Sequence, residues 1–588
     1  MNKKIPRTRN SAVFLKSISI ALHEMPWQFS IMLLVNVAFA IIPIFGISLS
    51  RTIYTQVQLS SIGGLNEKSF LLYVSLYFLY LILMKLFLIF YKRVYLQYGT
   101  MLSFEKKIKE KLHKKCNLIP LVNYESANIE NRIWEAKVAS INIYRIVEIA
   151  IYFISIVISI ILLGSYVSLI NPWLVTLVIL SGIPALVEKA IEGFINQSRR
   201  KKLTQLSKEE FAMRQNLLKI PNLKEIRVYN SFDFLFGKWM KVSHEYLDSQ
   251  YRVGKSIFKY KLIMRFLKTL AVFGIYLLCS LLLLNQHIDF GGFIAALMAA
   301  LFLQTQYDEL FSDAGYLIQF LQMGEPFFSF VEEKNTGDYT VVKERVELKN
   351  ASFIYPSGKV KVVKNLNFQI NKNEKIAIVG INGAGKSTIA KMILGFLPPC
   401  EGTFSINGTV IDLNNLCPSY YDSSAIFQNF CKYSLSMIDN ITISDTGTVI
   451  NNNRVLHLID DLSLSSVFYE RKDSILGKDF GEGDLSGGEW QKTAIARCLY
   501  KDADYFVLDE PTSAIDPYQE KNLNKLILDY SNGKTLIVIS HRLSIAKLVD
   551  KIYVINDGEI IEEGSHFDLI KLHENYYRLW EAQTSWYK

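Results

Sequence analysis

Residues 380–388 read Gly-Ile-Asn-Gly-Ala-Gly-Lys-Ser-Thr, and the rest of the sequence is best understood outward from this stretch. It fits the phosphate-binding pattern G-x-x-x-x-G-K-[ST]. The apolar run 375–379 before it has the composition of a short buried strand. Glycines allow positive φ and leave room for a phosphate chain, and the following helix offers its positive N-terminus. The pattern predicts a strand–loop–helix unit that binds a nucleoside triphosphate; a glycine-rich turn without a ligand is the alternative.

Individual positions of this loop have different expected roles. Lys386 is expected to reach the β- and γ-phosphates, and the Ser387 hydroxyl to ligate Mg²⁺. The predicted nucleotide-binding positions are Gly380, Asn382, Gly383, Ala384, Gly385, Lys386, Ser387 and Thr388.

The composition indicates a membrane protein. Half of the 588 residues are hydrophobic, 13% are aromatic and the mean hydropathy is +0.18, values that are high for a soluble chain. The formal charge of +10 would suit nucleic acid or a membrane surface. Because the basic residues crowd the segments beside apolar runs, the membrane is favoured and no nucleic-acid partner is expected. The six scattered cysteines predict neither disulfides nor a zinc site, and the basic start lacks the pattern of a cleaved signal peptide.

Six apolar segments of the first half are long enough to cross a bilayer, which takes about 20 residues. They lie at about 27–49, 70–91, 147–169, 172–194, 266–284 and 291–310. Three connecting loops are short and poor in Lys and Arg, whereas loops 92–145 and 197–265 are long and basic. The positive-inside rule therefore predicts a multi-pass protein of the cell membrane with both termini and both long loops in the cytosol.

Each long loop is expected to extend the spans as helices beyond the membrane. Breaks at Ile119-Pro120 and Ile220-Pro221 predict a short helix across each tip, around 123–131 and 220–232. Such a tip either contacts a cytosolic domain or forms a solvated hairpin.

Ionisable residues also occur within or beside the spans, where they often mark functional sites. Lys85 is expected to snorkel to the interface. Glu188 and Lys189 either line a cavity or mark the interface. An acidic group after the sixth span either attracts a cationic cargo or forms a solvated helical face; it consists of Asp308, Glu309 and Asp313.

The sequence changes character after Phe330. A polar linker at 334–339 leads to short strands with turns, predicted at 346–355, 366–370, 402–411 and 551–561. Buried strands are predicted at 375–379, 505–508 and 535–539, and each leads into a motif. This pattern predicts an α/β domain with its ligand at the carboxyl ends of the strands.

Two carboxylates follow the strand 505–508. Asp509 is placed to hold Mg²⁺ directly or through water, and Glu510 to polarise the attacking water. An acidic strand end without chemistry is the alternative.

A second phosphate-binding loop is predicted at Leu485-Ser486-Gly487-Gly488-Glu489, before the helical run 490–500. Ser486 and the amides of Gly487 and Gly488 would form an anion site at a helix N-terminus. Two such loops in one domain suggest a site that a second copy completes.

With these motifs in this order after six spans, the chain resembles ATP-binding cassette (ABC) transporters, whose signature motif is Leu-Ser-Gly-Gly. The resemblance implies ATP and Mg²⁺ as ligands and roles for further residues. Tyr355 looks like the aromatic residue that stacks on adenine, or else packs in the core. Gln428 looks like the glutamine that contacts Mg²⁺ and water, Ser513 to Asp516 like the loop that communicates across the dimer, and His541 like the switch histidine at the γ-phosphate.

In this family, ATP closes two cassettes head to tail, so each nucleotide lies between Lys386 of one copy and the signature segment Ser486, Gly487, Gly488 and Glu489 of the other. Glu510 would then be the catalytic base, assisted by Gln428 and His541. Because all motifs are intact, the resemblance implies a homodimer.

The order of spans and cassette resembles a half-transporter of the exporter-type (type IV) fold. The expected domains are a six-span domain at 1–330, a linker at 331–345 and a nucleotide-binding domain at 346–588. The segments 480–492 and 224–230 resemble exporters of lantibiotics and related bacteriocin-like peptides, without the N-terminal peptidase domain that some carry. A peptide is therefore the expected cargo. The alternatives are a multidrug or lipid exporter, or an importer with this fold; the six spans argue against a soluble ATPase that acts on DNA or ribosomes.

Overall fold

The structure is a computed structural model that describes residues 10–60, 67–332, 337–339, 344–356, 358–413, 416–418, 420, 422–472, 474–477 and 484–585. It has two compact units. The first contains Met1–Lys114 and Ile133–Glu332, and the second contains Lys115–Arg132 and Glu333–Lys588. The tip of the first long loop therefore groups with the cassette sequence.

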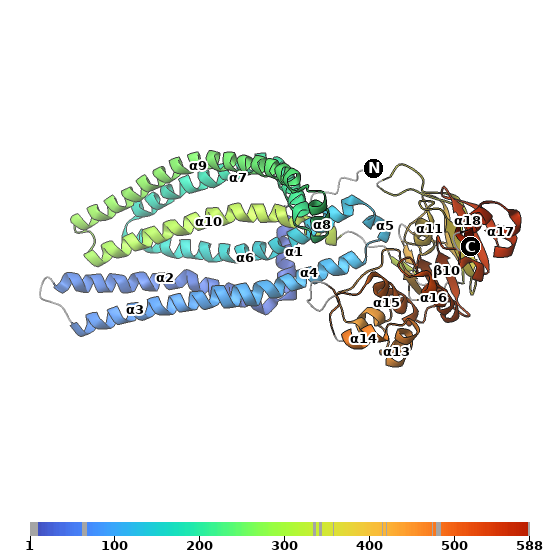
Figure 1. Ribbon diagram of the computed structural model, residues 1–588. Coiled ribbons are helices and arrows are strands. Elements are labelled where there is room, and N and C mark those ends of the chain that lie inside the picture. Colours follow the sequence, from blue (N-terminus) through green and yellow to red (C-terminus); the bar gives the residue numbers. More distant parts are fainter. Residues whose placement is uncertain are drawn as a thin grey trace. The chain divides into compact units, whose positions relative to one another are not determined.

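The first unit is a bundle of long helices that run side by side (Figure 1). Its helices are α1 (Asn10–Glu24), α2 (Pro26–Ser60), α3 (Glu67–Ile89), η1 (Phe90–Met101), α4 (Leu102–Asn117), α6 (Ala127–Ile170), α7 (Pro172–Leu218), α8 (Ile220–Val228), α9 (Phe232–Leu284) and α10 (Phe290–Val331). Six of these are long and apolar enough to cross a membrane: α2, α3, α6, α7, α9 and α10. The predicted number of apolar helices is thus confirmed, and α7 and α9 continue well beyond their apolar parts, as expected.

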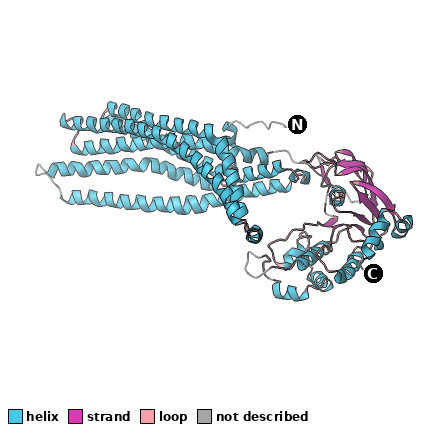
Figure 2. Cartoon of the chain, turned by 45° about the horizontal axis from the view of Figure 1, so that its top comes forward, coloured by secondary structure: helices cyan, strands magenta, loops and turns pink. Residues whose placement is uncertain are grey.

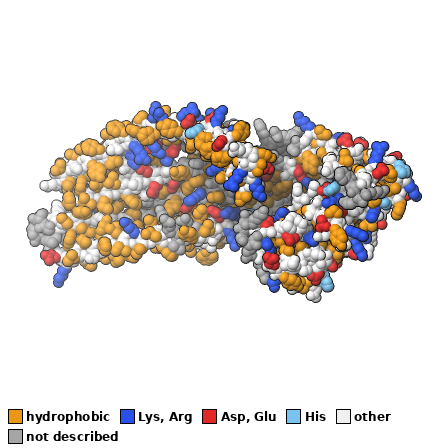
Figure 3. Space-filling model, in the orientation of Figure 1, with side chains coloured by type: hydrophobic (Ala, Val, Ile, Leu, Met, Phe, Trp, Pro, Cys, Tyr) orange, Lys and Arg blue, Asp and Glu red, His pale blue; other side chains and the backbone are white. Residues whose placement is uncertain are grey.

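The surface of this unit suits a bilayer because hydrophobic side chains cover most of the face in Figure 3. Charged side chains interrupt them partway along the bundle. No α3 residue is buried among the described part of the chain, although α3 is strongly apolar. Such a helix is stable in lipid rather than in water.

Two features of this unit were not predicted from the sequence. The helix α1 precedes the first span, and Lys16 on it forms an ion pair with Glu332. The segment η1 is a π-helix that joins α3 to α4. Within it, Tyr91 accepts a hydrogen bond of 2.8 Å from Asn36 Nδ2, a contact between distant segments that local sequence does not encode.

The second unit contains the strands, which Figure 2 shows gathered in one part of the chain. They are β1 (Gly337–Tyr339), β2 (Arg345–Phe353), β3 (Val363–Asn371), β4 (Lys375–Gly380), β5 (Glu401–Ile406), β6 (Thr409–Val410), β7 (Leu416–Pro418), β8 (Ser423–Ile426), β9 (Tyr505–Asp509), β10 (Thr535–Ile539), β11 (Lys551–Asn556) and β12 (Glu559–Gly564). Of the predicted linker at 334–339, residues 337–339 form β1 and residues 334–336 lie outside the described part.

The main sheet has the order β12-β11-β4-β10-β9-β8. Strands β11, β4, β10, β9 and β8 pair in parallel, and β12 pairs antiparallel with β11. A second, antiparallel sheet has the order β3-β2-β5-β6, and β1 pairs with β7. The predicted α/β fold is confirmed, with the motif-bearing strands side by side.

Helices cover the sheets and fill three apolar cores. They are α5 (Leu121–Tyr124), α11 (Lys386–Ile393), α12 (Met437–Thr442), α13 (Asn452–Asp461), α14 (Ser465–Arg471), α15 (Gly487–Tyr500), α16 (Pro517–Tyr530), η3 (Ala546–Leu548), α17 (His566–Leu572) and α18 (Asn575–Thr584). One core joins the second sheet to β4 and α11, another packs α12 to α15 against β8 and β9, and the third packs η3, α17 and α18 against β4 and β11. The helix that follows the phosphate loop, α11, therefore packs in a different core from the helix that follows the signature segment, α15.

The two loop tips are short helices, as predicted, although their bounds differ. The first, α5, covers Leu121–Tyr124, and residues from Ala127 onward already belong to α6. The second, α8, ends at Val228. Val122 packs against the first core of the cassette, and Lys391 Nζ donates a 2.7 Å hydrogen bond to Glu125 Oε1. The first tip therefore contacts the cassette within its own unit.

Candidate functional site

Four neighbouring parallel strands bring the predicted catalytic groups to one edge of the main sheet. The phosphate loop follows β4, Gln428 follows β8, Glu510 follows β9 and His541 follows β10. Carboxyl ends of parallel strands meet at one edge, where ligands bind in open α/β sheets. A cavity of about 510 Å³ lies there, lined by Val362, Asn382, Gly383, Gly385, Lys386, Ser387, Thr388, Gln428, Glu510 and His541.

The phosphate loop is shaped by backbone that only glycine adopts readily. Gly385 has φ +95° directly before α11, and a Cβ there would lie 2.9 Å from the Val362 carbonyl oxygen. A Cβ on Gly380 would lie 2.2 Å from the Ile555 carbonyl oxygen. The Gly558 N–H also donates to the Ala384 carbonyl at 3.1 Å. The loop is thus fixed against β11 and its turn before any ligand binds.

Lys386 is held within the loop that it is expected to serve. Its Nζ donates to the carbonyl oxygens of Gly380 at 2.9 Å and Ile381 at 2.8 Å. Burial lowers the pKa of this ammonium, while Glu510 and Asp509 work to raise it. A phosphate oxygen in the cavity would offer a charged partner in place of neutral carbonyls.

Glu510 lies between the other two predicted catalytic side chains. Its Oε2 accepts from Gln428 Nε2 at 3.0 Å, and its Oε1 lies 3.1 Å from His541 Nδ1. Its backbone has φ +50°, which is strained for a residue with a side chain. Its N–H donates to the Ile539 carbonyl at 2.9 Å, which fixes the turn to β10. Its carboxylate is therefore positioned to orient a water at the phosphate loop.

Asp509 and Ser387 fit the role of magnesium ligands. Asp509 is almost completely buried, and its Oδ1 has no hydrogen-bond partner among the described residues. Burial raises the pKa of this carboxyl, and a hydrogen bond with Ser387 opposes the increase. An unpaired buried carboxylate oxygen beside a hydroxyl is the kind of oxygen pair that Mg²⁺ takes together with phosphate oxygens.

The predicted signature segment lies outside this cavity. Ser486 caps α15 in a reciprocal capping box: its Oγ accepts from the Glu489 N–H at 3.3 Å, and its N–H donates to Glu489 Oε2 at 2.7 Å. Ser486 and Gly487 are exposed, and Gly488 and Glu489 are half-buried. Among the described residues that line the cavity, none belongs to this segment. The segment 480–492, which resembles peptide exporters, is described from residue 484 onward, and residues 480–483 lie outside the described part of the chain.

Gln491, which sequence reasoning did not assign to the site, connects the signature helix to the catalytic turn. Its Nε2 donates to the Glu510 carbonyl and to Ser513 Oγ, both at 3.2 Å. Its Oε1 accepts from the Ala514 N–H at 2.7 Å. The side chain is buried, so these bonds are not exchanged readily for bonds to water.

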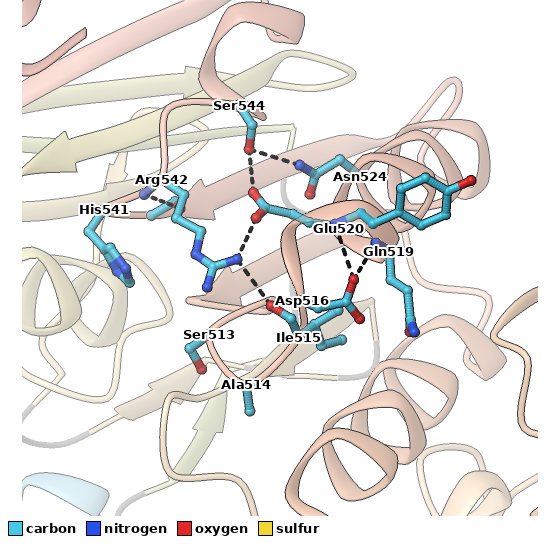
Figure 4. Close-up of polar contacts among 12 residues, drawn as sticks. Ser513, Ala514, Ile515, Asp516, Gln519, Glu520, Asn524, His541, Arg542 and Ser544 are labelled. Carbon is cyan, nitrogen blue, oxygen red and sulfur yellow. Dashed lines mark hydrogen bonds and ion pairs between the residues drawn. The ribbon is translucent and has the colours of Figure 1, made fainter. Parts of the chain in front are cut away.

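Asp516 has a structural contact that the sequence did not predict. Its Oδ1 caps α16 by accepting from the N–H groups of Tyr518 at 3.1 Å and Gln519 at 3.0 Å (Figure 4). Its role at a dimer interface remains a prediction.

A second unpredicted group lies behind His541. Glu520 on α16 accepts hydrogen bonds from Arg542 and Ser544, and Arg542 Nη1 also donates to the Ile515 carbonyl at 3.2 Å (Figure 4). Gln583 on α18 donates to the His541 carbonyl and accepts from the Leu543 N–H at 3.0 Å. The histidine loop, residues 541–544, is therefore hydrogen-bonded to α16 through Glu520 and to α18 through Gln583. The charged residue directly after His541, Arg542, was the one signal in the sequence for this group.

Tyr355 is not among the described residues that line the cavity. Its ring packs edge-on against Phe353 with centroids 5.0 Å apart, and its hydroxyl lies 3.0 Å from Thr388 Oγ1. Stacking on adenine remains a prediction, and the hydroxyl contact couples this residue to α11.

The fold and the site together define a nucleotide-binding cassette joined to a six-span helical domain. Residues 363–513 match the family described as ABC transporter. The chain is 28% identical to the subtilin transport ATP-binding protein SpaT of Bacillus subtilis over 81% of this chain and 80% of that protein. It is 27% identical to the nisin transport ATP-binding protein NisT of Lactococcus lactis subsp. lactis over 62% of each. It is also 27% identical to an ATP-dependent lipid A-core flippase of Alcanivorax borkumensis over 70% of this chain and 72% of that protein.

A solved structure of a bacterial Atm1-family ABC exporter with ATP bound has the same fold. The TM-score is 0.77 at 20% identity, and the match covers 95% of this chain and 99% of that one. The chain therefore has the exporter fold and carries an ABC transporter domain at residues 363–513, so the predicted fold class and the resemblance to ABC transporters are confirmed.

Proposed function

We propose that two copies of this chain form an ATP-driven exporter that moves a peptide of the lantibiotic or bacteriocin class across the cytoplasmic membrane. The observation that carries the proposal is the incomplete cavity, which holds the phosphate loop and catalytic groups but no described signature residue. The exposed Ser486 and Gly487 of a second copy would supply the missing contacts. Relatives named for subtilin and nisin transport support a peptide cargo.

In this proposal, Lys386 and the loop amides bind the β- and γ-phosphates of ATP, and Ser387 and Asp509 hold Mg²⁺, which neutralises phosphate charge. Glu510 orients and deprotonates the attacking water, while Gln428 and His541 fix its carboxylate. The basic long loops support a cytosolic location for the cassette and both termini.

A transport experiment with a catalytic control tests the proposal. Inverted vesicles that contain the wild-type chain should accumulate a lantibiotic-type peptide when MgATP is present, and Glu510→Gln vesicles should not. The variant should still bind ATP, while its hydrolysis falls by roughly 10²-fold or more because general-base catalysis is lost. Normal hydrolysis in this variant would remove Glu510 from the role of base.

A lipid exporter is the second candidate because lipid A-core flippases are also relatives at 27–29% identity. A labelled lipid in the same vesicles separates the two cargoes. ATP-dependent lipid movement without peptide accumulation would favour this candidate, and uptake only into right-side-out vesicles would instead indicate an importer.

A further inference from the structure

A charged cavity lies between three spans of the helical unit. Its volume is about 470 Å³, and its lining includes Glu188 and Lys189 from α7, Lys261, Arg265 and Lys268 from α9, and Asp308 from α10. The α9 residues recur at intervals of four and three, which puts them on one face of that helix. Four cationic and two anionic side chains line it, so the cavity has an excess of positive charge.

The three helices bring these groups to the same depth. Glu188 lies 16 residues from the start of α7, Lys268 16 residues from the end of α9, and Asp308 18 residues from the start of α10. At 1.5 Å per residue, these distances are roughly 24–27 Å from the short-loop side. The hydrocarbon core is about 30 Å thick. The cavity thus lies near the headgroups of the leaflet opposite the short loops.

Ion pairs within the cavity leave one cation available. Lys261 lies 3.5 Å from Glu188 and 3.8 Å from Glu192, Lys189 lies 3.3 Å from Glu192, and Lys268 pairs with Asp308. In the described part of the chain, Arg265 has no carboxylate within 4.0 Å, and it is exposed. Asp308 belongs to the acidic group for which the sequence left open a cationic cargo or a solvated helical face, and its charge is neutralised in part by Lys268.

The cavity also has an acceptor that lacks a donor. Asp308 Oδ1 is buried and has no hydrogen-bond partner among the described residues. Because this oxygen has no surface open to the cavity, the ligand is selected by Arg265, which requires an anionic group. Exposed apolar side chains follow the cations along α9, namely Leu262, Phe266 and Leu270. They provide a surface for acyl chains beside a charged headgroup.

We propose that this cavity binds the phosphodiester headgroup of an anionic phospholipid such as phosphatidylglycerol, from the leaflet opposite the short loops. Basic pockets between spans recognise anionic headgroups in this way. The lipid is a resident ligand whose binding does not depend on the identity of the cargo or on ATP hydrolysis.

Native mass spectrometry of the full chain from phosphatidylcholine nanodiscs with added phosphatidylglycerol tests this proposal. The wild type should retain phosphatidylglycerol in preference to phosphatidylcholine, and Arg265→Gln should lose roughly fivefold of this retention, equivalent to about 1 kcal/mol for one basic group. Arg265→Lys should keep most of it. Lys259→Gln is the matched control because Lys259 is an exposed α9 cation outside the described lining.

The proposal would be overturned by equal retention in Arg265→Gln and Lys259→Gln, by equal retention of both lipids, or by complete displacement by inorganic phosphate at the concentration of the lipid. The last would identify a site for free anions. Retention of a peptide in place of any lipid would also contradict the proposal. ATP binding by Arg265→Gln shows that the variant is folded, so a loss of lipid is separable from a failure of the ATP-driven function.

Discussion

At the scale of single residues, Asp509 and Glu510 are neighbouring carboxylates in opposite surroundings. Glu510 has side-chain partners on both oxygens, whereas Asp509 is buried with one unpaired oxygen. A buried polar atom without a partner costs about 1–3 kcal/mol. The structure thus keeps a destabilising oxygen at the position where Mg²⁺ is proposed to bind.

Asp509→Asn should therefore stabilise the nucleotide-free protein while removing its response to MgATP. The raised pKa of Asp509 means that its carboxyl favours the folded state when protonated, and that this contribution is lost as pH rises through the folded-state pKa. At neutral pH, the variant should melt roughly 2–4 °C higher without nucleotide. This gain in melting temperature should become smaller as the pH falls toward the range in which carboxyl groups are protonated. Differential scanning fluorimetry with and without MgATP measures both effects, and a lower nucleotide-free Tm would contradict this account.

At the scale of elements, Gln491 joins α15 to the turn after β9, so the helix that begins at the signature segment is bonded to the backbone of Glu510, the proposed catalytic base. Gln491→Ala leaves the Glu510 carbonyl and the Ala514 N–H without these partners in a buried place. We expect kcat for ATP to fall about tenfold, which corresponds to about 1.4 kcal/mol, with little change in KM. Lys492→Ala is the control on the same helix. A change in KM alone would instead indicate a role in nucleotide binding.

The Arg542–Glu520 pair ties the histidine loop to α16 and is suited to a double-mutant cycle. Removing one partner of a largely buried ion pair leaves an uncompensated charge, at a cost of several kcal/mol. Arg542→Met and Glu520→Leu should each destabilise the cassette, and the double variant should recover part of the loss. Urea unfolding followed by the fluorescence of Trp490 and Trp580 measures the coupling. Additive losses would show that the two side chains act independently.

The strands and motifs of the site were predictable because each motif is local: an apolar run ends and its functional residue follows. The partners of these residues were not predictable. Gln491 and Ser513 are 22 residues apart, and Gln583 and His541 are 42 apart, so only packing of the helices brings them together. In the spans, hydropathy predicted the helices, but the pairing of Lys268 with Asp308 depends on how α9 and α10 pack.

At the scale of the whole molecule, the proposed transport requires that the ATP site and the loop tips respond to each other. The contact between Glu125 and Lys391 provides such a link, because Lys391 lies on α11 directly after the phosphate loop. Burial works to lower the pKa of Lys391, yet the hydrogen bond with Glu125 leaves it raised. Both side chains are about one-third exposed, so the pair should contribute at most about 1 kcal/mol to stability.

Charge reversal separates this coupling from stability. Glu125→Lys and Lys391→Glu each place like charges at the contact, and each should reduce peptide transport several-fold more than ATP hydrolysis. The combination restores opposite charges in the reversed order and should recover transport. Because the pair is partly exposed, raising the salt concentration should weaken both the defect and the recovery. Transport per ATP hydrolysed, measured in proteoliposomes, is the readout. If the double variant transports no more peptide per ATP hydrolysed than either single variant, this ion pair is not the link between the loop tip and the ATP site. The link must then run through apolar packing, such as that of Val122.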